Sequence, residues 1–107
     1  MWNENLEELI VVKRSGQRVE FNASKIAIAI KKAYENTFNE PDEKKVFKIF
    51  EKVLCYINYN YKERKTITVE DIQDIIEKIL KESNEIDVYN SFNEYRNKRA
   101  ASRKVFT

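Results

Sequence analysis

The chain has 107 residues, of which 42% are hydrophobic and 36% charged, so one packed domain with a charged surface is expected rather than disorder. The 20 lysines and arginines exceed the 18 acids only enough for a net charge of +2, which is too small for gripping nucleic acid by bulk charge. The sequence has no histidine, one cysteine (Cys55) and one glycine (Gly16), which excludes histidine-based triads, cysteine cages for zinc and glycine-rich phosphate loops.

No part of the sequence is typical of a membrane or secreted protein. The longest apolar run, residues 26–30, is far shorter than the roughly 20 residues that span a bilayer. The acidic start lacks the positively charged region and the apolar stretch of a secretion signal. With a lone cysteine, these features predict a cytoplasmic protein.

A β-hairpin is expected after a polar lead-in over residues 1–8. The apolar start and the alternating pattern that follows it predict strands at about residues 9–13 and 18–21. The link between them contains Gly16, which can adopt the positive φ that a tight turn requires.

Two helices are expected after the hairpin. Asn22 offers an N-cap for a helix over residues 23–36. After a loop over residues 36–42, in which Pro41 suits the first turn of a helix, a second helix is expected over residues 42–60. Apolar residues recur at helical spacing in both: Ile26, Ile30 and Ala33 in the first, and Val46, Phe50, Val53, Leu54, Ile57 and Tyr61 in the second.

One more strand and two more helices complete the chain. Residues 66–68 favour a short strand because all three, a threonine, an isoleucine and a threonine, are β-branched. Thr68 and Asp71 form a capping signal for a helix that starts directly after Thr68, and residues 83–84 end it. A last helix starts near residue 86. The order β-β-α-α-β-α-α predicts a single α+β domain with helices packed under a small sheet.

Three cations are expected close to one helix start. Lys13 and Arg14 lie at the tip of the hairpin, and Lys25 lies in the first turn of the helix over residues 23–36. Unpaired N–H groups at a helix start together with cations suit an anion such as phosphate. Charged residues beside a hairpin turn are also commonly just solvated, so both interpretations stay open at this point.

Other conspicuous residues have a structural interpretation. Phe92 is expected in the core, whereas Tyr95, which could stack a base, lies at a boundary position. Cys55, in the middle of a helix, is expected to be a buried and inert thiol. The lysines at 31–32 are interpreted as solvated helix-face charges. Capping and surface positions are assigned to the acids Glu70, Asp71 and Asp74.

Three segments resemble the ATP-cone family. They are residues 11–26, with Lys13-Arg14-Ser15-Gly16 and Phe21-Asn22 followed by Lys25-Ile26, then residues 68–77, and then residues 89–103 with Tyr95, Arg96, Arg99 and Arg103. The last segment is similar to the closing motif of cones from anaerobic ribonucleotide reductases. The resemblance covers nearly the whole chain, and it implies a cone domain over residues 9–104.

The resemblance implies a four-helix bundle capped by a three-stranded mixed sheet, and an allosteric site for ATP or dATP, with or without Mg²⁺. Such a cone senses nucleotide and does not hydrolyse it, so the chain is not expected to be an enzyme. The phosphates would meet Lys13, Arg14, Lys25 and Arg99, and Asn22 would contact phosphate or ribose. The adenine and sugar would be surrounded by Val11, Phe21, Ile26, Val69, Ile72 and Gln73, with Tyr95 closing the pocket.

Two departures from the family pattern concern the hairpin. Ser15 stands where the family usually has an acid, and is interpreted as a turn residue. Many cones also carry an acid two residues before the phenylalanine, where this chain has Val19. Glu20 follows it, but adjacent strand residues face opposite sides of a sheet, so Glu20 is not expected to replace that acid.

The expected partners are an adenine nucleotide and either a second copy of the chain or a ribonucleotide reductase, because cones act on oligomeric state. The lead-in has no cysteine ribbon of the kind that precedes the cone of the reductase-gene repressor. The alternative is a helical module that has this fold but binds a protein or nucleic acid through its last helix and does not bind nucleotide.

Overall fold

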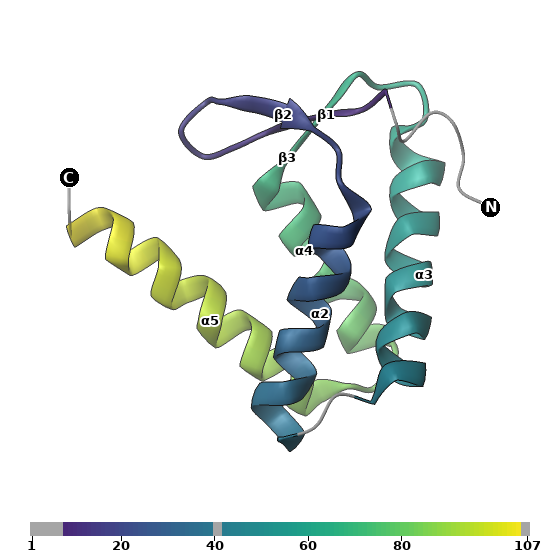
Figure 1. Ribbon diagram of the computed structural model, residues 1–107, viewed down its shortest axis with the longest axis vertical. Coiled ribbons are helices and arrows are strands. Elements are labelled where there is room, and N and C mark those ends of the chain that lie inside the picture. Colours follow the sequence, from purple (N-terminus) through teal and green to yellow (C-terminus); the bar gives the residue numbers. More distant parts are fainter. Residues whose placement is uncertain (1–7, 40–41, 106–107) are drawn as a thin grey trace.

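A small sheet lies at one end of four helices in the computed structural model, which describes residues 8–39 and 42–105 and the side chains as far as residue 98 (Figure 1). The lead-in and Pro41 lie outside the described residues. The elements are β1 (Ile10–Val12), β2 (Arg18–Glu20), α2 (Ala23–Phe38), α3 (Glu43–Tyr61), β3 (Thr66–Thr68), α4 (Val69–Glu82) and α5 (Ile86–Val105). Their order confirms the predicted α+β class with a small sheet on four helices.

The sheet is mixed, with β1 between its two neighbours. β1 pairs antiparallel with β2, so that Val11 lies opposite Val19, and parallel with β3, so that Val11 also lies opposite Ile67. The hairpin link is closed by a hydrogen bond from the Gly16 N–H to the Lys13 carbonyl at 2.8 Å. Gly16 has φ +92°, a conformation that residues with a Cβ rarely adopt. The one glycine therefore lies at the turn predicted for it.

The helix ends follow the capping residues of the sequence. The Asn22 side chain accepts a hydrogen bond from the Ser24 N–H at 3.0 Å, and α2 begins at the residue after Asn22. Thr68 and Asp71 form a reciprocal capping box at the start of α4. The helix α2 runs to Phe38, two residues beyond the predicted end, because it closes at Asn39 in a left-handed conformation with φ 66°.

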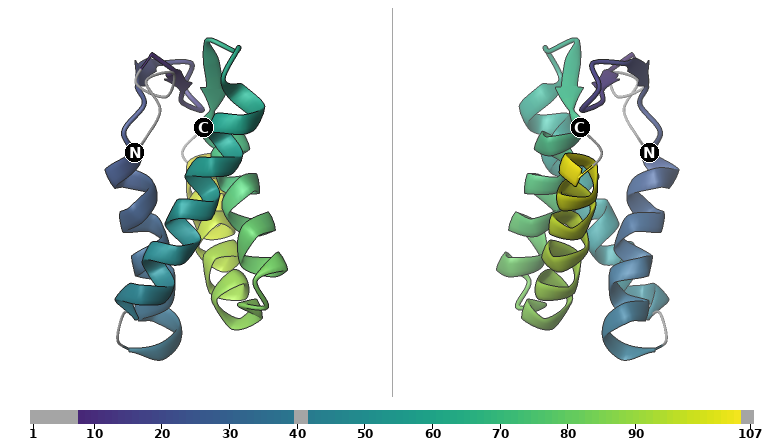
Figure 2. Two further views of the ribbon diagram at one scale, coloured as in Figure 1. Left: turned by 90° about the vertical axis from the view of Figure 1, so that its right-hand side faces the viewer. Right: turned by 90° about the vertical axis from the view of Figure 1, so that its left-hand side faces the viewer.

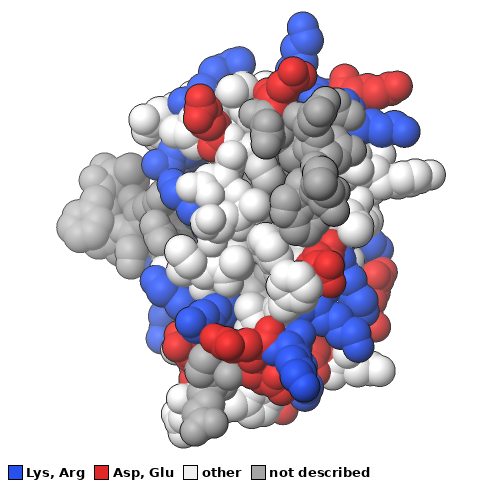
Figure 3. Space-filling model, turned by 45° about the vertical axis from the view of Figure 1, so that its right-hand side comes forward, with Lys and Arg blue, Asp and Glu red and all other residues white. Residues whose placement is uncertain are grey.

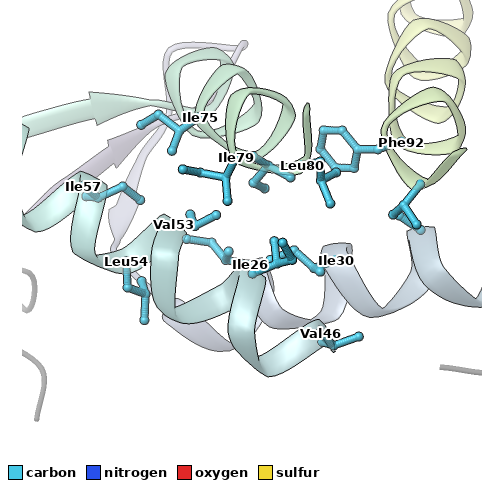
Figure 4. Close-up of a cluster of buried hydrophobic side chains, with 14 of the residues drawn as sticks. Ile26, Ile30, Val46, Val53, Leu54, Ile57, Ile75, Ile79, Leu80 and Phe92 are labelled. Atoms are coloured by element: carbon cyan, nitrogen blue, oxygen red, sulfur yellow. The ribbon is translucent and has the colours of Figure 1, made fainter. Parts of the chain in front are cut away.

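The core lies between the helices and is closed at one end by the sheet (Figure 4). The predicted stripes of α2 and α3 are buried, except that Phe50 and Tyr61 are only half-buried. Tyr34 of α2 and Ile49 of α3 are buried as well, outside the predicted stripes. The prediction for Cys55 was wrong, because its side chain is exposed on α3. The buried stripe of α3 passes through its neighbours at 53, 54 and 57, so position 55 faces away from the core.

The helices form two sides beneath the sheet. Figure 2 shows α2 on one side of the molecule and α4 and α5 on the other. The first half of α5 is anchored by Val88 and Phe92, which are 0% and 4% exposed, as expected for Phe92. The second half of α5 extends away from the bundle (Figure 1). Among the described residues, no helix is both long and apolar enough to cross a membrane.

Candidate functional site

A cavity of about 300 Å³ lies where the hairpin, α2, α4 and α5 meet. Its size is at the lower end of the range for small-molecule sites in proteins. Both sides of the molecule contribute, because α2 supplies one wall and α4 and α5 supply the other. The sheet contributes residues of β1 and β2. The cavity is therefore built by segments from both ends of the chain.

The mouth of the cavity is cationic. Lys13 follows β1, and Lys25 and Lys32 lie on α2 seven residues apart, which places them on the same face of the helix. All three side chains are exposed. The first turn of α2 lies here too, and its N-terminal N–H groups carry a partial positive charge. Three ammonium groups and a helix start can together hold a polyanion.

The interior of the cavity is largely apolar. α4 presents Val69, Ile72 and Ile76, and α5 presents Phe92. Gln73 lies among these apolar residues as the polar lining residue of α4. Tyr95, 43% exposed, lies at the edge on α5. A slot of this kind can accept a flat ring system, with a few polar groups fixing its orientation.

Most residues that the sequence placed in the site lie around this one cavity. They are Val11, Lys13, Phe21, Asn22, Lys25, Ile26, Val69, Ile72, Gln73 and Tyr95. Arg99 lies on α5, but its side chain is outside the part of the chain whose side chains are described. The structure thus gathers residues that lie up to 84 positions apart in the sequence.

Arg14 is placed differently. It does not line the cavity, and its guanidinium lies against α4, where Nη2 donates to Oε1 of Gln73 at 2.9 Å and Nε pairs with the Glu70 carboxylate. The Arg14 side chain is only 20% exposed. In this conformation Arg14 contacts the site through Gln73.

An ion cluster joins α4 to α5 beside the cavity. Nη2 of Arg96 donates to the Glu70 carboxylate at 2.6 Å. Its Nη1 lies 2.8 Å from the Asp74 carboxylate and 3.2 Å from that of Glu77. The three acids lie at i, i+4 and i+7 on α4, which places them along one face of the helix. As expected, Asp71 caps the helix and Asp74 is exposed; the ion pairs of Glu70 and Asp74 with Arg96 were not predicted.

The acids of the cluster stabilise the charged form of Arg96. Burial alone would lower the pKa of its guanidinium, but the hydrogen bonds to Glu70 and Asp74 and the charge of Glu77 raise it above its ordinary value. Arg96 is 15% exposed, so these contacts lie in a partly dehydrated place. The cluster therefore ties α5 to α4 at the point where α5 passes the cavity.

Sequence reasoning missed several lining residues, namely Val19, Glu20, Ile28, Ala29, Lys32, Ile76 and Phe92. Ala29 and Lys32 follow Lys25 at helical spacing, and that periodicity could have identified them. Val19 and Glu20 both line the cavity, although Glu20 was not expected to replace the acid of the family pattern.

A metal ion of the protein's own has little to hold it. Among the described residues, no group of three or more carboxylate, cysteine or histidine side chains is placed so that it could hold a metal ion. Glu20 is the one carboxylate among the described residues that line the cavity. These residues fit a Mg²⁺ that arrives with phosphates and keeps its waters, since magnesium is commonly bound by one carboxylate plus phosphate oxygens.

The fold and cavity together define a ligand-binding domain with a polycationic mouth and an apolar interior. The ATP cone domain family model matches residues 9–101. The chain belongs to the ATP cone domain family, whose members are nucleotide-sensing regulatory domains. No match was found among curated proteins.

Proposed function

We propose that this chain binds an adenine nucleotide, ATP or dATP, in the cavity between the hairpin, α2, α4 and α5, and acts as an allosteric sensor rather than as an enzyme. The observation that carries the proposal is that the cavity is lined by the residues that the family motif assigns to nucleotide. A sensor has to bind its ligand reversibly, and the described side chains at the cavity include no histidine or cysteine nucleophile that would suggest chemistry on it.

The polyphosphate is assigned to the mouth of the cavity. Lys13 and Lys25 contact it together with Asn22 and the first N–H groups of α2, and Lys32 adds a third ammonium. The family motif also assigns Arg99 of α5 to the phosphates, and a Mg²⁺ would be held by the phosphate oxygens with Glu20 as the available carboxylate. In this assignment, side-chain cations and a helix start bind the phosphates, and no glycine-rich loop is needed.

The adenine and sugar are assigned to the apolar part. Val11, Phe21 and Ile26 supply one side, Val69 and Ile72 the other, and Tyr95 closes the edge. Burial of a base against such side chains contributes roughly 25 cal/mol per Å² of apolar surface removed from water. The cations would therefore select a polyphosphate, and the slot would select a flat base.

The test is isothermal titration calorimetry with ATP, dATP and GTP. Saturable binding of ATP or dATP is expected, and Lys25→Ala should weaken it about tenfold or more, because a hydrogen bond to a charged group contributes about 1.5–3 kcal/mol. Lys13→Ala should act similarly. Lys44→Ala, which removes an exposed lysine of α3 away from the cavity, is the matched control and should bind as the parent does. No binding at millimolar nucleotide would refute the proposal.

The output is proposed to be self-association or contact with a ribonucleotide reductase in the cytoplasm. Size-exclusion chromatography with and without nucleotide tests the first, and co-elution with a reductase tests the second. An interaction module without nucleotide binding predicts no response to ATP. Nucleic acid is a poor fit to the face in Figure 3, where positive and negative side chains are interspersed around an uncharged area.

A further inference from the structure

The amide of Gln73 has one defined orientation. Its Oε1 accepts a hydrogen bond from Arg14 Nη2 at 2.9 Å. A guanidinium has five N–H donors and no acceptor, so the amide atom that faces it has to be the oxygen. Among the described residues, the Nε2 group of Gln73 makes no hydrogen bond within the protein, and Gln73 lines the cavity. The amide therefore presents N–H donors to a ligand.

Arg14 is itself held in place. Its Nε pairs with Glu70, and Glu70 also accepts from Arg96 at 2.6 Å. The chain of contacts runs from the hairpin tip through α4 to α5, and both arginines are largely shielded, with 20% and 15% of the side chain exposed. Because the guanidinium is planar and its Nε is fixed by Glu70, its Nη2 can hold Gln73 in a single orientation.

The neighbours of Gln73 determine which part of a nucleotide it meets. Val69 and Ile76 lie four residues before and three residues after it, which places all three on the same face of α4. The lysines of the mouth that lie on a helix, Lys25 and Lys32, belong to α2 on the opposite wall (Figure 2). A donor surrounded by apolar side chains suits the edge of a base better than a phosphate.

We propose that Gln73 donates to a ring nitrogen of the bound purine, and that Arg14 is a positioning residue that holds the Gln73 amide in the donating orientation. The inference rests on the proposed function and adds which kind of atom of the base the protein recognises, a ring nitrogen. Arg14 thereby has a role distinct from the phosphate contact that the resemblance implies. An amide free to rotate would present its oxygen as often as its nitrogen, and that oxygen repels a ring nitrogen.

The first experiment compares ATP with its 1-deaza, 3-deaza and 7-deaza analogues, each of which lacks one ring nitrogen. For the parent chain, one analogue should bind about tenfold more weakly than ATP, which is the upper range for the net effect of one hydrogen bond. In Gln73→Met, which has a similar shape and no donor, ATP and that analogue should bind equally.

The second experiment tests the positioning role of Arg14. Arg14→Met should reduce the discrimination between ATP and the weak analogue. Arg14→Lys should restore much of it, because an ammonium also only donates and therefore still selects Oε1. A role in folding alone predicts equal discrimination in both variants. Gln73→Glu adds a complementary measurement: it keeps a partner for Arg14, so its melting temperature should not fall, while its ATP affinity should.

The outcomes separate the two proposals. If ATP binds but all three analogues bind equally well, or if discrimination survives in Gln73→Met, the inference is overturned and the proposed function stands. The same holds if affinity depends on the 2′- or 3′-hydroxyl and on no ring nitrogen, since Gln73 then serves the ribose. If the parent chain binds no ATP at millimolar concentration, the proposed function itself fails.

Discussion

Replacement of Arg96 by methionine is expected to destabilise the domain through the acids it leaves behind. Arg96 lies between Glu70, Asp74 and Glu77, at distances from 2.6 to 3.2 Å. Methionine keeps much of the aliphatic volume and removes the charge. Three carboxylates would then line one face of α4 without the cation that now joins them to α5, and only Glu70 would retain an arginine, Arg14.

The size of the effect follows from burial. Losing one partner of a fully buried ion pair costs about 3–5 kcal/mol, whereas exposed pairs contribute about 0–1 kcal/mol. Arg96 and Glu77 are each 15% exposed, but Glu70 and Asp74 are 47% and 65% exposed and can be solvated. Glu77 also keeps a hydrogen bond from Asn93 at 2.9 Å. We therefore expect a loss of about 2 kcal/mol in the free energy of unfolding.

Urea unfolding followed by circular dichroism measures this loss. The matched control is Lys98→Met on the same helix, whose ion pair with Glu94 is 3.7 Å long and about three-quarters exposed, and which should cost under about 0.5 kcal/mol. For a domain of this size, about 2 kcal/mol corresponds to a melting temperature lower by roughly 10 °C. Equal stability of the two variants would refute the conclusion that the cluster holds α5 to α4.

Three further changes have defined outcomes. Burial and the hydrogen bond to Glu85 raise the pKa of Tyr34 above its ordinary value near 10, so the contribution of Tyr34 to stability is complete below pH 10 and is lost as pH rises further. In urea unfolding, Tyr34→Phe should therefore be less stable than the parent by about 1 kcal/mol at pH 7, with the difference closing above pH 10, and a difference that stays constant with pH would contradict this. Gly16→Ala should cost about 1 kcal/mol through its φ of +92° alone, because nothing lies within 4 Å of the added Cβ, and a neutral result in thermal melts would show that the turn adapts. Thr68→Ala should cost about 1 kcal/mol by removing the cap of α4, while Thr68→Ser should retain stability; equal losses would assign the effect to packing.

The secondary structure could be predicted because its signals are local. Asn22 and Thr68 mark helix starts, Gly16 marks the turn, and the apolar spacing predicted for α2 and α3 matches most of their buried faces. Cys55 shows the limit of this reasoning. A lone cysteine in the middle of a helix suggests burial by residue type, but the phase of the helix places position 55 on the exposed side.

The residues of the candidate site could be predicted where they belong to a family motif, and less well where tertiary packing determines the position of the side chain. The motif located Lys13, Lys25 and Gln73 at the cavity. It did not indicate that Arg14 turns to α4, since that depends on how close the hairpin tip lies to the start of α4. Lys32 was interpreted as solvated, and it is exposed, but the position of α2 beside the hairpin brings it to the cavity mouth.

The central claim, that an adenine nucleotide occupies this cavity, is tested most directly by amide chemical shifts of the ¹⁵N-labelled chain during an ATP titration. Saturable shifts are predicted for Lys13, Lys25 and Gln73, with little change at Cys55 and Lys44 on α3. Shifts that do not saturate, or that concentrate on α3 and leave the cavity unaffected, would contradict the account.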